Sequence, residues 1–438
     1  MDIIIIGFAL FAMFFGAGNL IFPPFIGNMY GSNWLIAGIG FVLTGVGITA
    51  LTVISMAKKR GNILEFTSAA GKKLGFVVTL LICLCIGPLG AIPRVGATSA
   101  EITIAAGINI PYWIFVVVFF SLSCYFALSG SKVIDIIGKY LTPALLLVLL
   151  MMIISGIINP IGPIEVSEYS AGQVFADSAV QGYNTMDAIA ALAFTPIIIK
   201  SVIDKGHEDT LVRTTVKSSA VAVIGLAIVY TALTYLGAIT SVVHNNIESR
   251  VDLLIYIASE VLGVYGKYIL SAIIILACFT TSIGLISSIA DIFEAMSNHK
   301  FSYKQFVIGI TVISLALSLM GVDSIIKFVF PFLSFVYPLV ILMIVYNLLP
   351  KLPSVRVRKI TFTVVGVVSL IQGLSELIGA ANEAAGKSVA RIIGWIPLSD
   401  SGFPWLVPFI LALIIALVFL DKNESINAIK KEIKLFRE

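Results

Sequence analysis

Runs of about 20 apolar residues recur along the chain, and this recurrence restricts the chain to one broad architecture. An α-helix of roughly that length spans the hydrocarbon core of a bilayer. Because backbone groups in hydrocarbon must find their hydrogen-bond partners within the protein, helices are the expected element. Hydrophobic residues make up 59% of the 438 residues and charged residues only 12%, which excludes a soluble globular protein. We therefore predict an all-α polytopic membrane protein.

The hydropathy pattern predicts twelve transmembrane helices. They are expected near residues 3–25, 34–57, 74–104, 112–129, 140–160, 178–200, 215–239, 267–295, 304–320, 325–349, 360–380 and 403–420. With the N-terminus in the cytoplasm, 22 of the 28 lysines and arginines fall on the inside and five on the outside, while Arg94 lies within the third span. This bias predicts that both termini are cytoplasmic. The net charge of +4 then reflects topology, and no nucleic-acid partner is expected.

The reactive side chains form no recognisable catalytic or metal-binding set. All four cysteines fall inside apolar spans, and the three histidines are scattered along the chain. Buried cysteines of this kind act as small hydrophobic residues. An intramembrane enzyme needs an acid–base or nucleophilic constellation within the spans, and the spans contain none. We expect neither an enzyme nor a bound cofactor.

The first span is interrupted by Gly16-Ala17-Gly18-Asn19. Glycine costs about 1 kcal/mol relative to alanine inside a helix. A broken backbone at membrane depth is tolerated where protein or a polar cavity satisfies its free groups. Freed carbonyls can then hold a cation and freed amides an anion. The alternative is a glycine-rich packing face, which is common in membrane helices.

A second interruption lies in the sixth span and favours the first of these interpretations. It reads Gly182-Tyr183-Asn184-Thr185-Met186-Asp187. Spans one and six are corresponding members of two five-helix units, and the odd number of spans makes the second unit inverted. Paired interruptions at matching positions indicate a transporter binding site. We predict a first repeat at 1–160, a second repeat at 161–350, and two further helices with a cytoplasmic tail at 351–438.

The eighth span carries three consecutive hydroxyl residues, Thr280, Thr281 and Ser282, after Ala277. Hydroxyls in membrane helices commonly bond back to a carbonyl one turn earlier. Hydroxyl and carbonyl oxygens also suit a small monovalent cation. Together with the break in span one, the run indicates a cation site.

These residues resemble motifs of the bacterial branched-chain amino acid:cation symporter family. The matching segments are Phe14 through Pro24, Gly87-Pro88, Pro93 through Thr98, Gly182-Tyr183 with Thr185-Met186-Asp187, and Thr280-Thr281 with Gly284-Leu285. The resemblance implies the LeuT-type five-plus-five inverted-repeat fold and sodium-coupled uptake of leucine, isoleucine and valine across the bacterial cytoplasmic membrane. One departure is that only two residues precede the first span, where family members usually carry a basic leader.

The resemblance also implies a single sodium ion and its ligands. Matching the fold's sodium site to this sequence gives backbone carbonyls of Phe14, Ala17 and Ala277 and the hydroxyls of Thr280 and Thr281. No second sodium site carries over.

The two interruptions are the expected substrate site. The α-carboxylate of the amino acid should meet free amides of Gly16, Ala17, Gly18 and Asn19 at a half-helix N-terminus. The ammonium group should meet carbonyls of Gly182, Tyr183, Asn184 and Thr185, with the Tyr183 ring as a wall or gate. An apolar pocket would take the branched side chain.

Arg94 and Asp187 are ionisable residues inside spans three and six, and such residues are functional by default. We hypothesise that they pair and couple the two spans; a purely structural ion pair is the alternative.

Two alternative functions stay open for the whole chain, a proton-coupled symporter and an amino acid exchanger of the same fold. The hydroxyl pair at Thr280 and Thr281 favours sodium, because it offers no titratable group.

Overall fold

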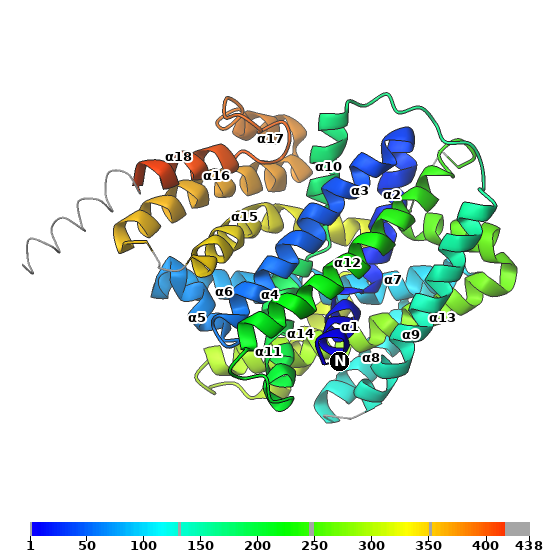
Figure 1. The fold of residues 1–438 in the computed structure, drawn as a ribbon, viewed down its shortest axis with the longest axis horizontal. Coiled ribbons are helices and arrows are strands. Elements are labelled where there is room, and N and C mark those ends of the chain that lie inside the picture. The colour runs from blue at the N-terminus through cyan, green and yellow to red at the C-terminus, as the bar shows by residue number, and fades with distance from the viewer. Residues whose placement is uncertain (1, 130–132, 245–248, 350–352, 417–438) are drawn as a thin grey trace, which may run out of the picture. The chain divides into compact units, whose positions relative to one another are not determined.

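The computed structural model describes residues 2–129, 133–244, 249–349 and 353–416, and over these ranges it contains helices and no strand (Figure 1). The α-helices are α1 (Asp2–Phe14), α2 (Ala17–Tyr30), α3 (Trp34–Val42), α4 (Thr49–Ala57), α5 (Ile63–Thr67), α6 (Lys72–Ile86), α7 (Ala91–Ala105), α8 (Tyr112–Ser129), α9 (Val133–Ile158), α10 (Ala171–Asn184), α11 (Asp187–Asp204), α12 (Leu211–Ala238), α13 (Arg250–Met296), α14 (Tyr303–Ser318), α15 (Val322–Leu348), α16 (Val355–Ala381), α17 (Glu383–Ala390) and α18 (Leu406–Ala416). Two short 3-10 helices, η1 (Gly31–Asn33) and η3 (Ser68–Ala70), and one π-helical segment, η2 (Leu43–Ile48), complete the set. The all-α prediction is confirmed.

The described helices include many that can cross a membrane. Seven stretches are long and apolar enough, and the bent pair α10 and α11 makes an eighth. Shorter apolar helices occur at Asp2–Phe14, Pro143–Ile158, Tyr303–Ser318 and Leu406–Ile415. One of the seven stretches, Asn19–Ala57, contains the end of the first expected span and all of the second. The number of twelve crossings stays a prediction, because length and apolarity do not show where each helix enters the bilayer.

The chain divides into two compact units. The first unit combines Met1–Ala57 with Cys83–Val329, and the second combines Lys58–Ile82 with Phe330–Glu438. Both interrupted spans lie in the first unit. The repeat boundaries at 160 and 350 stay a prediction, because compactness does not test an inverted repeat.

In the first unit, α2 packs closely along α12 (Figure 1). A Cβ atom added to Gly27 would lie 1.8 Å from the Thr234 carbonyl oxygen, and one added to Gly237 would lie 1.9 Å from that of Pro24. Small residues let membrane helices approach until their backbones touch. This contact fixes α2, the helix that begins at the first interruption.

In the second unit, side chains of α15 and α16 bond to the segment before α6. The Asn347 amide donates to the Phe66 carbonyl at 2.9 Å, and Arg358 donates to the Ala69 carbonyl at 2.9 Å. The hydroxyls of Tyr346 and Thr361 lie 2.5 Å apart. These bonds hold α5 and η3 against the two long helices.

We predict that Gly27→Ala lowers the thermal unfolding midpoint of the purified protein by several degrees. The added methyl group has no room, and overpacking costs about 1–3 kcal/mol. The matched control is Gly309→Ala on α14, where nothing lies within 4 Å of the added atom. That control should leave the midpoint unchanged or raise it, and equal losses in the two variants would contradict the close approach.

Candidate functional site

The first interruption separates α1 from α2 where the sequence predicts a break. Helix α1 ends at Phe14 and α2 begins at Ala17, so Phe15 and Gly16 lie between them. Gly16 has an extended backbone, and no side chain caps the start of α2. The first amides of a helix have no partner within the helix. No atom lies within 4 Å of a Cβ added to Gly16, so there is open space beside these amides.

The second interruption separates α10 from α11 at Thr185 and Met186. The two helices are bent by 42°, and Met186 adopts the left-handed region at φ 65°. A residue other than glycine rarely adopts this conformation, which recurs at functional sites. Asp187 then occupies the first turn of α11, where the helix dipole favours a negative charge.

The Asn19 side chain joins the two interruptions. Its amide nitrogen donates to the Phe14 carbonyl at 2.7 Å and to the Asp187 carboxylate at 2.5 Å. The Tyr230 hydroxyl also donates to the Phe14 carbonyl, at 3.4 Å. Asn19 is buried, with 2% of its surface exposed. The end of α1 and the starts of α2 and α11 therefore share one buried set of hydrogen bonds.

Arg94 on α7 holds the end of α10. Its guanidinium donates to the Asn184 carbonyl and, at 2.8 Å, to the Thr185 carbonyl. It also lies over the Phe22 ring, 5.7 Å from the ring centroid. The last carbonyls of a helix carry partial negative charge, and the planar fork of arginine can reach two of them at once. Two carbonyls expected to bind the substrate ammonium thus accept hydrogen bonds from Arg94.

The two residues of the hypothesised pair, Arg94 and Asp187, both lie at the second interruption. Both residues contact the interruption in the sixth span, Arg94 at its carbonyls and Asp187 as the first residue of α11. A direct ion pair, and its role in coupling, stays a prediction.

The other residues of the second interruption differ in what surrounds them. Gly182 packs against η2, and a Cβ added there would lie 2.0 Å from the Thr44 hydroxyl. The Tyr183 side chain is buried. Asn184 donates to Gln181 at 3.3 Å, while its side-chain oxygen is buried and accepts no hydrogen bond from any described residue. A buried acceptor of this kind calls for an explanation, and a bound donor supplies one.

The expected sodium ligands on α13 bond to one another. The hydroxyls of Thr280 and Thr281 donate to the Ala277 carbonyl at 3.0 and 2.9 Å. A hydroxyl that donates still has lone pairs for a cation. The neighbouring Ser282 hydroxyl is buried and bonds to none of the described residues.

Helix α13 contacts α2. In the ranges the structure describes, however, no hydrogen bond joins Phe14 to the residues of the α13 run. The described residues also hold no cluster of three or more histidines, cysteines, aspartates or glutamates that could bind a metal. The assignment of sodium ligands stays a prediction.

Sequence reasoning missed three residues that surround the interruptions. Phe22 lies under Arg94, Tyr230 donates to Phe14, and Thr44 donates to the Ala179 carbonyl at 2.7 Å. Phe22 belongs to the motif of span one, and the glycines of η2 mark an irregular helix. Nothing in the sequence distinguishes Tyr230 from other aromatic residues of apolar spans.

Two broken helices joined inside a helical membrane protein match the LeuT-type fold expected from the sequence. The chain is similar in structure to Mhp1, a nucleobase-cation-symport-1 family transporter in a closed conformation, with a TM-score of 0.62 and 14% identity over 94% of this chain and 90% of that one. The inward-facing conformation of Mhp1 gives the same TM-score. This similarity confirms the fold expected from the sequence.

The chain belongs to the branched-chain amino acid transport protein family, whose family model matches residues 1–423. It is 34% identical to the branched-chain amino acid transport system 2 carrier protein of Pseudomonas aeruginosa, over 95% of both chains. It is also 34% identical to the branched-chain amino acid permease BraB of Bacillus subtilis, over 98% of both chains. The family consists of membrane transporters and not enzymes, as expected.

We predict that Asn19→Ala and Asp187→Ala are strongly coupled in stability. Each single substitution leaves the partner group buried without its hydrogen bond. The double variant should therefore lose less thermal stability than the two single variants added together. Coupling between bonded residues is about 0.5–3 kcal/mol. The quantity to measure is the unfolding midpoint of the four proteins in one detergent.

The matched control uses Asn28, another buried asparagine on α2, whose amide donates to Thr240 and to the His244 carbonyl. Asn28→Ala and Asp187→Ala should be additive, because Asn28 lies nine positions after Asn19 on α2, a rise of about 13.5 Å along a helix. Additive losses in both pairs would show that Asn19 and Asp187 are not coupled, which contradicts the hydrogen bond between them.

Proposed function

We propose that this protein is a sodium-coupled symporter that imports leucine, isoleucine and valine by alternating access. The observation that carries the proposal is the buried bond of Asn19 to Asp187, which joins the two helix breaks in a chain of this family. The names of both relatives refer to branched-chain amino acids, which supports that substrate class. We place the protein in the bacterial cytoplasmic membrane with both termini in the cytoplasm.

The start of α2 is the proposed carboxylate site. Its first amides have no side-chain cap, and open space adjoins Gly16. A helix N-terminus offers partial positive charge to an anion. The Asn19 backbone amide already donates to the Gly16 carbonyl at 3.0 Å. The α-carboxylate of the substrate would therefore accept hydrogen bonds from the remaining backbone amides of the Gly16–Asn19 break.

The end of α10 is the proposed ammonium site. Arg94 already donates to the carbonyls of Asn184 and Thr185, so the unpartnered side-chain oxygen of Asn184 is the better acceptor for the ammonium group. The Asp187 carboxylate is a second candidate, because it begins α11 at the same break. Tyr183 remains the proposed wall of the side-chain pocket.

The coupling step that we propose is a competition at the Phe14 carbonyl. Sodium bound by Phe14, Ala17, Ala277, Thr280 and Thr281 would share an oxygen that accepts bonds from Asn19 and Tyr230 in this structure. If sodium weakens the hydrogen bond from Asn19 to the Phe14 carbonyl, the hydrogen bond from Asn19 to Asp187 would change as well. Sodium binding at the first break would in this way alter the conformation of the second break.

The energetics suit an ion-driven transporter of modest selectivity. The membrane potential supplies about 2.3 kcal/mol per charge for each 100 mV. An apolar pocket distinguishes one methylene by only about 1–3 kcal/mol, so leucine, isoleucine and valine should compete with one another.

Proton coupling is the second candidate, and one observation favours it. Asp187 is a buried carboxyl group bonded to the first break, and a proton there would alter its bond to Asn19. An amino acid exchanger of the same fold would need no ion at all. The three mechanisms differ in the gradient that drives uptake.

The deciding experiment is leucine uptake into proteoliposomes under imposed sodium, potassium or proton gradients. We expect a sodium gradient to drive accumulation and the other two to give only background uptake. Unchanged uptake after replacement of sodium would rule out the coupling claim, and accumulation driven by a proton gradient alone would favour the second candidate.

We further predict that Thr281→Ala raises the sodium concentration needed for half-maximal uptake by about tenfold or more, since one cation ligand is lost. Competition by isoleucine and valine should be unchanged, because the side-chain pocket is intact. Thr281→Ser keeps the hydroxyl and should resemble the unmodified protein. An equal sodium requirement in all three proteins would remove Thr281 from the ion site.

A further inference from the structure

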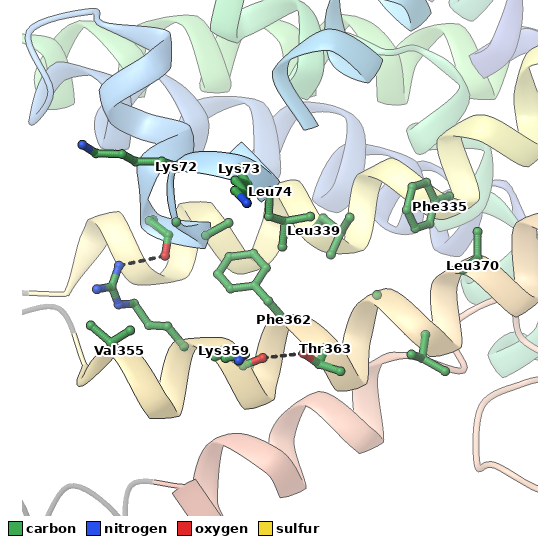
Figure 2. A pocket seen from close by; sticks show the side chains of 16 residues that line it. Lys72, Lys73, Leu74, Phe335, Leu339, Val355, Lys359, Phe362, Thr363 and Leu370 are labelled. Carbon is green, nitrogen blue, oxygen red and sulfur yellow. Dashed lines mark hydrogen bonds between the residues drawn. The ribbon is translucent and has the colours of Figure 1, made fainter. Parts of the chain in front are cut away.

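The second unit contains a groove that the transport proposal does not use. It has a volume of about 610 Å³ and lies between α16, the start of α6 and the segment of α15 that carries Phe335 and Leu339 (Figure 2). Pockets that hold organic ligands have volumes of about 300–1,000 Å³. The groove is therefore large enough for a sizeable apolar group.

The interior of the groove is apolar. Phe335, Leu339, Phe362 and Leu370 line it, and Figure 2 shows Phe362 extending from α16 toward the segments opposite. Gly366 widens it, because the nearest atom to an added Cβ is a Leu339 methyl group at 3.8 Å. Among the described residues that line the groove there is no aspartate or glutamate, so no carboxylate offsets the positive charges nearby.

The rim of the groove is basic. Lys72, Lys73, Arg358 and Lys359 all line it. Arg358 donates to the backbone carbonyls of Ala69 and Pro353, which fixes its position without neutralising its charge. Within the described part of the chain, none of the four pairs with a carboxylate. One end of the apolar groove is therefore surrounded by four basic side chains that have no carboxylate partner among the described residues.

The basic rim coincides with the ends of helices that can span the bilayer. Lys72 is the first residue of α6, and Val355 at the same rim is the first residue of α16. Both helices belong to stretches long and apolar enough to cross a membrane. We therefore expect the rim at the level of the lipid headgroups, with the groove running into the hydrocarbon, and the lysine and arginine bias predicts that this end is cytoplasmic.

We propose that this groove binds an anionic phospholipid, with an acyl chain along Phe362 and Gly366 and the phosphate against Lys72, Lys73, Arg358 and Lys359. Basic pockets between transmembrane helices on the cytoplasmic side bind anionic headgroups, and each nearby lysine or arginine adds to the attraction. A zwitterionic lipid would fill the groove but gain little from the rim. None of the residues that line the groove belongs to either helix break, so the proposal does not depend on which ion drives transport.

The test is lipid retention by the full-length purified protein, measured by native mass spectrometry with dioleoyl phosphatidylglycerol and dioleoyl phosphatidylcholine. We expect phosphatidylglycerol to be retained about tenfold more tightly. The variant Lys72→Gln/Lys73→Gln/Lys359→Gln should lose this preference. The control Lys200→Gln/Lys300→Gln/Lys304→Gln, which removes three exposed lysines elsewhere in the chain, should keep it.

A second variant tests the acyl chain separately from the charges. Gly366→Phe fills the groove and leaves the rim intact, so it should weaken retention of both lipids. Inorganic phosphate, which has no acyl chain, should not displace phosphatidylglycerol.

Three results would overturn the proposal. They are equal retention of the two lipids by the unmodified protein, equal loss in the site and control variants, and displacement by phosphate alone. A concentration-dependent dimer that is lost in the site variant, without any lipid preference, would instead assign the groove to a second copy of the chain. If the triple variant does not fold, the unmodified protein and Gly366→Phe still decide the outcome.

Discussion

The amide of Asn19 is the contact on which the core of the first unit depends, because it closes both helix breaks at once. Breaking a helix inside a membrane leaves backbone groups that water cannot satisfy. Asn19 supplies a donor to the last carbonyl of α1 and a second donor to the carboxylate that begins α11. One buried side chain thus stabilises two interruptions that lie 168 residues apart in the sequence.

Charge in this core is distributed over helix ends as well as side chains. Arg94 bonds to carbonyls at the end of α10, and Asp187 lies at the start of α11, so each charge faces a helix end of opposite sign. A charge removed from water is costly unless it is paired and hydrogen-bonded. The arrangement places each charge against a helix end, and the start of α2 has no side-chain cap. Among the described residues, the Asn184 side-chain oxygen has no hydrogen-bond donor.

The sequence predicts the broken helices well and their partners poorly. Glycine and asparagine inside apolar runs are a local signal, so the breaks at Gly16 and near Thr185 could be located without coordinates. The bonds from Arg94 to α10 and from Tyr230 to Phe14 join segments far apart in the chain, and no local pattern encodes them. The groove beside Phe362 was missed for another reason: its apolar lining resembles any helix face that meets lipid.

The most direct test of the joined helix breaks as the substrate site is a crystal structure of the protein with leucine and sodium bound. The account predicts the leucine carboxylate within hydrogen-bond distance of the backbone at Gly16–Asn19 and the ammonium group beside Asn184 or Asp187. It also predicts a changed Asn19–Phe14 contact when sodium occupies the first break. Leucine bound elsewhere, with the bonds of Asn19, Asp187 and Arg94 unchanged, would contradict it.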